Sequence, residues 1–422
     1  MTSEERPFNL RSVAVAVFLP TLLFSIGEGA IIPIIPAVAG NLGATLAVAG
    51  VISSLIMLGE LVGDVPSGWI VSRIGERFAM MWAALLAVVG VATAAISPNP
   101  FVLALGIFCI GLATAVFGLA RHAFMTTYVP IRYRARALSS LGGVFRAGTF
   151  IGPFLAAGVI HLTGTSQAAF WVMVVCCVGS AVTLLVLPDP AEMFGRPSPT
   201  RSTDGEARTE GEELAAAESS GLLSAIRTHG AVLTRMGTTA ALVGAMRSCR
   251  AVLLPLWAVS IGLSETETAL IIGVVGAVEF ALFYASGQIM DRWGRIWTAV
   301  PSMVGLGSGF IILAFTHDLD SAAVWFIAVA LVLALSNGLG SGILMTLGSD
   351  LAPPDRPAPF LGAYRFLGDA GTAAAPLAMS GITAAASISL AAGTIGGVGL
   401  IGAFLLFRFI PRFIDRGSRP FP

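Results

Sequence analysis

Ionisable side chains stand inside long apolar runs of this sequence. A charge near the centre of a bilayer is costly, so such residues usually mark substrate pathways or proton transfer. Glu28 lies inside the first apolar run, and Arg247 and Arg250 lie inside the seventh. A carboxylate beside Arg can exchange that partner for a proton or a solute. We therefore expect these three residues to face one cavity, where Glu28 pairs with Arg247 and carries the proton; the alternative is a static buried pair.

Three more carboxylates follow in apolar runs. Glu60 and Asp64 are four residues apart, so they share one face of a helix. Two carboxylates that close favour the protonated form of one of them. Glu279 stands in the eighth run. All three are candidates for proton coupling, and gating through a nearby Arg is the alternative role.

Further polar residues complete the candidate cavity and its seams. Asn337 and Ser341, together with Ser336, lie in the tenth run and either line a cavity or pack helices together. We expect Arg146 in the fifth run to contact Glu279. We also expect Arg365 or Asp369 in the eleventh run to contact the second run. Plain interhelical contacts are the alternative for these pairs.

The composition explains where these residues must sit. The chain has 422 residues, of which 56% are hydrophobic and 11% are charged, against about 25% charged in soluble domains. About 20 apolar residues span a bilayer, and we count twelve such runs. They lie near 12–38, 45–71, 78–97, 101–125, 138–160, 168–187, 232–260, 267–290, 297–316, 322–347, 359–381 and 387–410.

A polar segment divides the runs into two sets of six. We predict an all-α membrane protein with an N-terminal six-helix bundle (1–187), a cytoplasmic linker (188–230) and a C-terminal six-helix bundle (231–422). The linker composition favours a mobile segment that ends in a short amphipathic helix. Arg is confined to alternate loops, which predicts that both termini and the linker face the cytoplasm of a cell-membrane protein.

The sequence excludes several other classes. The formal net charge is zero, which argues against a nucleic-acid partner. No catalytic constellation, clustered metal ligands or nucleotide-binding loop is visible in the sequence, so we expect no enzyme, no metal and no cofactor. The four Cys residues stand in apolar runs and are expected to pack helices.

The two halves repeat each other. Displaced by 219 residues, Gly43 falls on Gly262 and Glu60 falls on Glu279, while "GWIVSRIGER" (68–77) falls on "GQIMDRWGRI" (287–296). Further along, a displacement of 223 places "GTFIGP" (148–153) on "GTAAAP" (371–376). Internal duplication of six-helix halves is typical of secondary transporters, whose substrate sites lie between the repeats near the bilayer midplane.

Two motifs resemble a known family. "GQIMDRWGR" (287–295) resembles the G-x-x-x-D-R-x-G-R signature of the major facilitator superfamily, and the first-half copy has Ser72 in place of the Asp. "GTFIGPFLAAG" (148–158) is similar to an element of the proton-coupled drug exporters of that superfamily. The resemblance implies a tight cytoplasmic turn whose charges hold the bundle in one state, and simple anchoring is the alternative. The candidate latch and gating residues are Asp291, Arg292, Arg295, Gly287, Gly294, Arg73, Arg77, Gly152, Pro153, Arg146 and Asp369.

Together these features predict a monomeric transporter in the lipid bilayer that works by alternating access. The exporter resemblance implies proton-coupled efflux of small amphipathic or hydrophobic, drug-like compounds. The first alternative is a proton-coupled uptake symporter, since Arg247 and Arg250 suit a small anionic solute. The second alternative is a membrane scaffold or sensor that moves no substrate.

Overall fold

The computed structural model describes residues 17–129, 131–187, 200–201, 207–208, 227–353 and 357–414. These residues are helical or in connecting turns apart from two short strands, β1 (Thr200–Arg201) and β2 (Ala207–Arg208), which pair antiparallel. This confirms the all-α prediction. The amphipathic helix expected at the end of the linker lies outside the described residues.

The first half contains six membrane-length helical segments, and the first of them is broken into three pieces. The elements are α2 (Leu19–Ile31), η2 (Ile32–Ile34), α3 (Ile35–Asn41), α4 (Leu46–Ile74), α5 (Glu76–Ala95), α6 (Pro100–Tyr128), α7 (Ile131–Thr163), η3 (Ser166–Ala169) and α8 (Phe170–Val186).

The second half repeats this order, and here the first segment contains a π-helical turn, η4, while the fourth segment is broken into two helices. The elements are α12 (Gly230–Val232), η4 (Leu233–Gly237), α13 (Thr238–Ser260), α14 (Glu265–Trp293), α15 (Ile296–Ala314), α16 (Ala322–Leu339), α17 (Ile343–Leu351), α18 (Pro357–Ala385) and α19 (Ile388–Phe413).

Eleven helices among the described residues are long and apolar enough to cross a membrane. The 29-residue helix α18, which carries Arg365 and Asp369, occupies the position of the remaining predicted span. All twelve predicted runs therefore correspond to helices, and the chain is a multi-pass membrane protein.

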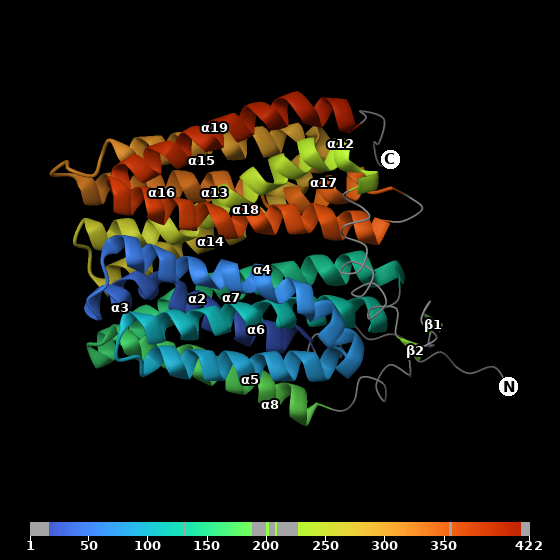
Figure 1. The fold of residues 1–422 in the computed structure, drawn as a ribbon, viewed down its shortest axis with the longest axis horizontal. Helices are drawn as coiled ribbons and strands as arrows, with labels where there is room; N and C mark the ends of the chain where they lie inside the picture. Colours follow the sequence, from blue (N-terminus) through green and yellow to red (C-terminus); the bar gives the residue numbers. More distant parts are fainter. Residues whose placement is uncertain are drawn as a thin grey trace.

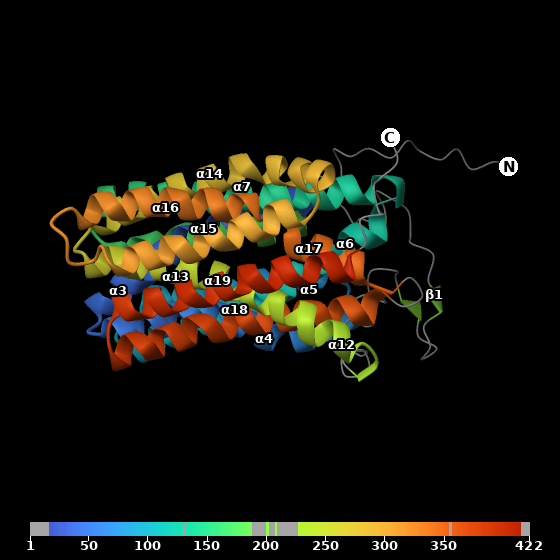
Figure 2. The ribbon, with the colours of Figure 1, turned by 90° about the horizontal axis from the view of Figure 1, so that it is seen from above.

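The halves form two bundles that lie side by side with their helices roughly parallel (Figure 1). In the first half α4 and α5 pack on α6, and α2 packs on α7. The same arrangement recurs in the second half, where α14 and α15 pack on α16 and α13 packs on α18. Two seams join the bundles: α14 lies against α7, which is also seen in Figure 2, and α18 lies against α4.

The structure bears out the internal repeat. Helices α4 and α14 each have 29 residues, and both of their ends differ by the same displacement of 219. Thr45 and Ser264 cap the two N-termini by accepting a hydrogen bond from the backbone N–H three residues ahead. Both helices end at glycines with positive φ, Gly75 (φ 81°) and Gly294 (φ 95°), a conformation that L side chains rarely adopt. Equivalent sequence signals thus build equivalent helices.

Small residues let helices approach closely in both bundles. A Cβ on Gly152 would lie 2.3 Å from the carbonyl oxygen of Ile26, so α7 touches the backbone of α2. A Cβ on Gly371 would lie 2.2 Å from the carbonyl oxygen of Ala241 in the same way. Close backbone approach at small residues is the usual basis of helix packing in lipid. The glycines at these two helix crossings therefore have a packing role.

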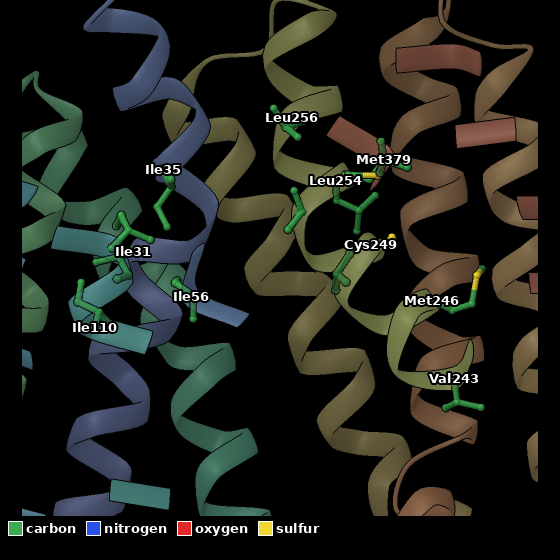
Figure 3. Packing of buried hydrophobic residues seen from close by; sticks show 14 of the residues in the cluster. Ile31, Ile35, Ile56, Ile110, Val243, Met246, Cys249, Leu254, Leu256 and Met379 are labelled. Atoms are coloured by element: carbon green, nitrogen blue, oxygen red, sulfur yellow. The ribbon is translucent and has the colours of Figure 1, made fainter. Parts of the chain in front are cut away.

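Buried apolar side chains fill each bundle next to the interface between the halves. Figure 3 shows Ile31, Ile56 and Ile110 on the first-half side and Cys249 and Leu254 on the second-half side. These residues are at most 2% exposed. The bundles are therefore solid, and the polar residues of interest sit where the two bundles meet.

Candidate functional site

Glu28 on α2 is 5% exposed and lies within electrostatic range of Arg121 on α6. Its Oε2 atom is buried without a hydrogen-bond partner. The guanidinium of Arg121 also lies over the ring of Phe145, 4.7 Å from its centroid. Both charged groups belong to the first half. Glu28 therefore has its compensating charge within its own bundle.

Arg247, the counterpart of Glu28 in the repeat, donates from Nη2 to the carbonyl oxygen of Gly340. That carbonyl belongs to the break between α16 and α17, where Gly342 adopts a left-handed conformation (φ 78°). A helix break leaves backbone carbonyls free to accept, and a cation satisfies them well. The expected pairing of Glu28 with Arg247 is wrong for this structure, because each residue faces the fourth helix of its own half.

Arg250 and Glu279 form a bidentate ion pair between α13 and α14. Nη1 of Arg250 lies 2.5 Å from Oε1 of Glu279, and Nη2 donates to Oε2 at 3.1 Å. Asn337 on α16 donates to the same Oε2 at 2.7 Å. The Nε atom of Arg250 and the Oδ1 atom of Asn337 are buried without partners. The charges of Arg250 and Glu279 balance each other, but these buried polar atoms make no hydrogen bond.

A cavity of about 130 Å³ lies beside this pair, between the two halves. Gly29, Ile32, Thr149 and Pro153 form the first-half wall. The second-half wall consists of residues of α13 and α14, including Arg250 and Glu279. The 3₁₀ segment η2 interrupts the first span at this wall, and irregular backbone at membrane depth occurs where protein or a cavity covers it. Arg250, predicted to lie in the substrate cavity, lines this cavity.

The predicted cavity residues of the tenth run, Asn337, Ser341 and Ser336, have different surroundings in the structure. Neither Asn337 nor Ser341 is among the cavity-lining residues, but Asn337 reaches the site through Glu279. The Oγ atom of Ser341 is buried without a partner. Ser336 bonds to the carbonyl of Val332 and packs on Gly305, which is the packing role.

Arg146 on α7 does not pair directly with Glu279, although it lies within electrostatic range of that residue and of Arg250. Its guanidinium lies 4.9 Å from the ring centroid of Phe283 on α14. Because Arg250 occupies the Glu279 carboxylate, the predicted pair is replaced by a cation–π contact across the seam. Arg146, Arg247, Arg250 and Glu279 are called the basic cluster below.

The second seam holds an acidic cluster, which consists of Glu60, Asp64, Arg365 and Asp369. Arg365 on α18 lies 3.7 Å from Asp64 on α4 and 3.5 Å from Asp369. Asp64 and Asp369, which belong to different halves, therefore contact the same guanidinium. The predicted contact of Arg365 and Asp369 with the second span is confirmed. Glu60 lies within electrostatic range of all three residues.

The signature residues at the ends of α4 and α14 hold their own halves together. Arg295 donates to both carboxylate oxygens of Asp350 in α17 at 2.8 and 3.3 Å, and this hydrogen bond raises the pKa of Arg295. Arg77 donates to the backbone carbonyls of Leu184 and Leu187 at the end of α8. Arg side chains at helix C-termini are favoured by the helix dipole. These contacts latch helices within a half.

Several latch predictions change in detail. The expected turn is confined to the end of "GQIMDRWGR", because α14 continues to Trp293. Gly287 makes no close approach, since a Cβ there would meet nothing within 4 Å. Asp291 and Arg292 are exposed, and Arg73 stacks 5.4 Å from the ring centroid of Trp69. Gly294 makes no close approach either, but its positive φ (95°) forms the turn.

The halves contact each other at the opposite end of the molecule and along the seams. Asn41 at the end of α3 donates to Glu265 at the start of α14 at 3.0 Å. Phe150 on α7 stacks on Phe280 on α14, with ring centroids 5.2 Å apart. The contacts of Arg77 and Arg295, by contrast, stay within one half. The contacts between the halves named here therefore lie along the seams and at the end that carries Asn41.

Sequence reasoning missed Arg121. The residue stands in the fourth apolar run. The repeat held the signal, because the displacement of 219 that pairs Glu28 with Arg247 also pairs Arg121 with Gly340. Within the described residues, no group of three or more His, Cys, Asp or Glu side chains could hold a metal ion.

Comparisons with known proteins fit this architecture. The family model described as Major Facilitator Superfamily matches residues 17–376. The chain belongs to this superfamily. It is therefore a secondary transporter and not an enzyme, as the sequence predicted.

Curated relatives match only in part. A galactose-proton symporter of Escherichia coli is 27% identical over 42% of this chain and 38% of its own length. A probable inositol transporter of Arabidopsis thaliana is 23% identical over 54% of this chain and 40% of its own length. The matched segment thus spans about two-fifths of these relatives.

Solved structures confirm the fold over nearly the whole chain. A proton:xylose symporter has a TM-score of 0.65 at 14% identity and covers 95% of this chain and 96% of its own. A peptide-binding transporter of the POT family has a TM-score of 0.76 at 12% identity, with 96% of each chain covered. Identities this low show the fold alone.

Proposed function

We propose that this protein is a proton-coupled symporter that takes up a small polar solute across the cell membrane. The observation that carries the proposal is the acidic cluster, in which Arg365 lies between Asp64 of one half and Asp369 of the other. In this proposal the termini face the cytoplasm, and the protein works as a monomer by alternating access.

The acidic cluster suits a proton carrier for a simple chemical reason. Two carboxylates that share one guanidinium leave one negative charge uncompensated, which favours the binding of a proton to one of them. Asp64 and Asp369 share Arg365 in this way across the seam, where relative movement of the bundles would separate them. A proton bound here therefore favours the state in which the halves touch, and its loss favours separation.

The cavity at the other seam suits the solute. Its volume of about 130 Å³ is small beside the ~300–1,000 Å³ of sites for drug-sized ligands. The curated relatives reported above include a galactose-proton symporter and a probable inositol transporter. Both facts favour the uptake alternative over efflux of drug-like compounds.

The test is the direction of proton movement in proteoliposomes. We would impose an inward gradient of a candidate solute and follow internal pH with a trapped dye. Symport predicts that solute entry acidifies the lumen, whereas drug:proton antiport predicts that it alkalinises the lumen. Asp369→Asn should abolish the acidification. Asp320→Asn, at an exposed carboxylate in the loop after α15, is the matched control and should behave as wild type.

Two results would contradict the proposal. Alkalinisation by any compound would support the exporter interpretation. No flux of any solute across a panel of sugars, polyols and organic anions would support a scaffold or sensor. Acidification that survives in Asp369→Asn would move the proton to another carboxylate, with Glu28 the next candidate.

A further inference from the structure

The polar side chains that line the cavity are Thr149 and the ion pair of Arg250 with Glu279. We propose that the cavity binds a small organic monoanion, whose carboxylate takes the place of Glu279 on Arg250. The apolar body of the solute would then lie against Ile32, Leu254 and Val275, which line the same cavity. This inference rests on the proposed function, because it names the solute class of that site.

The charges around the cavity favour an anion. Arg146, Arg247 and Arg250 lie within electrostatic range of one another, and Glu279 is the carboxylate that acts on them. The basic cluster therefore has an excess of positive charge at a site of low dielectric, where attraction for an anion is strong. A cation would add to this excess. A monoanion reduces it.

Glu279 is already placed as an exchangeable ligand. Its Oε2 atom accepts from Nη2 of Arg250, and its Oε1 atom lies 2.5 Å from Nη1 but has no hydrogen-bond partner. A solute carboxylate can make the same ion pair in the fork geometry that guanidinium groups offer to carboxylates. When Glu279 leaves Arg250, its Oε2 still has Asn337 as a donor, so the displaced carboxylate is not left unpartnered. The exchange conserves hydrogen bonds.

A neutral polyol fits this cavity less well. Among the side chains that line it, only Thr149, Arg250 and Glu279 are polar. A sugar or inositol would bury several hydroxyls against Ile, Leu and Val, and each unmade hydrogen bond would weaken binding. A carboxylate concentrates its polarity at one end and leaves an apolar body for the remaining wall. The lining thus distinguishes this chain from a polyol carrier.

The experiment measures binding to the purified full-length protein, and no transport is needed. Benzoate and benzamide are a matched pair, because they share shape and differ in charge, and myo-inositol represents the polyols. We expect benzoate, and not benzamide or myo-inositol, to raise the melting temperature and to give a saturable titration. Arg250→Gln should weaken benzoate binding at least about tenfold, the size of one charge-assisted contact.

Glu279→Gln provides an independent readout if Arg250→Gln does not fold. Removing the competing carboxylate should tighten benzoate binding and increase the stabilisation that benzoate gives. Arg408→Gln is the control, because Arg408 is exposed on α19 and far along the chain from the cluster.

The possible outcomes separate this inference from the proposed function. Benzoate binding that depends on Arg250, without solute-driven proton movement, supports the inference and contradicts the symporter proposal. Binding of myo-inositol in place of benzoate overturns the inference and leaves symport standing. Benzoate binding that is unchanged in Arg250→Gln also overturns it, as does the absence of benzoate binding.

Discussion

The two halves place different chemistry on one scaffold at equivalent positions. In the first half a carboxylate on α2, Glu28, faces Arg121 on α6. In the second half the equivalent positions hold Arg247 on α13 and Gly340, and Arg247 donates to the backbone carbonyl of Gly340. The charge on the first helix is reversed, and a break in the fourth helix supplies the acceptor. In both halves the first helix thus faces the fourth, but the charged side chain on the first helix is acidic in one half and basic in the other.

The two seams between the halves also differ in the sign of their charge. The acidic cluster has three carboxylates and one Arg, whereas the basic cluster has three Arg and one carboxylate. Protons bind to carboxylates, and anions bind to guanidinium groups. The difference assigns proton handling to the seam of α4 with α18 and solute binding to the seam of α7 with α14. This division is the central claim of our account.

The largest expected effect comes from removing Arg121. Arg121→Met would leave Glu28 buried without its compensating charge, which we expect to lower the unfolding free energy by about 3–5 kcal/mol. The double variant with Glu28→Gln removes both charges and should recover most of the loss. Thermal unfolding of purified variants in a double-mutant cycle measures this. Additive losses would show that the two residues do not interact.

The acidic cluster is next in expected size. Asp64→Asn removes the charge that faces Arg365 across the seam. Coupling free energies between two sites are typically about 1–3 kcal/mol, which corresponds to about five- to 150-fold in an equilibrium. We expect proton-driven uptake to fall by that factor while solute exchange persists. Equal loss of both activities would instead indicate a structural role.

A variant of Arg247 tests the contact between α13 and the break in the fourth helix of the second half. Arg247→Ala frees the carbonyl of Gly340 and should loosen the junction of α16 and α17. Hydrogen exchange of the amides near Gly342 should rise, while the amides of α6, the unbroken counterpart, stay protected. Unchanged exchange at this junction would mean that Ser286, which also donates to carbonyls there, is sufficient to hold it.

The smallest effect is expected at the glycines. Gly342→Ala places a side chain at φ 78°, which costs about 1–2 kcal/mol. Gly287→Ala is the matched control, since a Cβ there meets nothing within 4 Å and its φ is not positive. The melting temperature of Gly342→Ala should therefore be lower than that of Gly287→Ala. Equal temperatures would argue that the left-handed turn is not required.

Much of the scaffold was predictable from the sequence, because lipid imposes length and polarity on every span. The twelve runs, the repeat and the glycine that ends α14 follow from such local rules. Side-chain partners do not, because they depend on helix rotation, to which hydropathy is insensitive. Glu28 and Arg247 were correctly placed on equivalent helices, yet each contacts the fourth helix of its own half. The loss of a direct Arg146–Glu279 pair has the same cause, since Arg250 is closer.

One measurement tests the division between the seams most directly. Proteoliposomes would be assayed for solute counterflow, which needs binding and exchange only, and for solute-driven acidification, which also needs the proton. The account predicts that Asp369→Asn keeps counterflow and loses acidification, whereas Arg250→Gln loses both. Counterflow that survives in Arg250→Gln, or that disappears in Asp369→Asn, would contradict the assignment of solute and proton to separate seams.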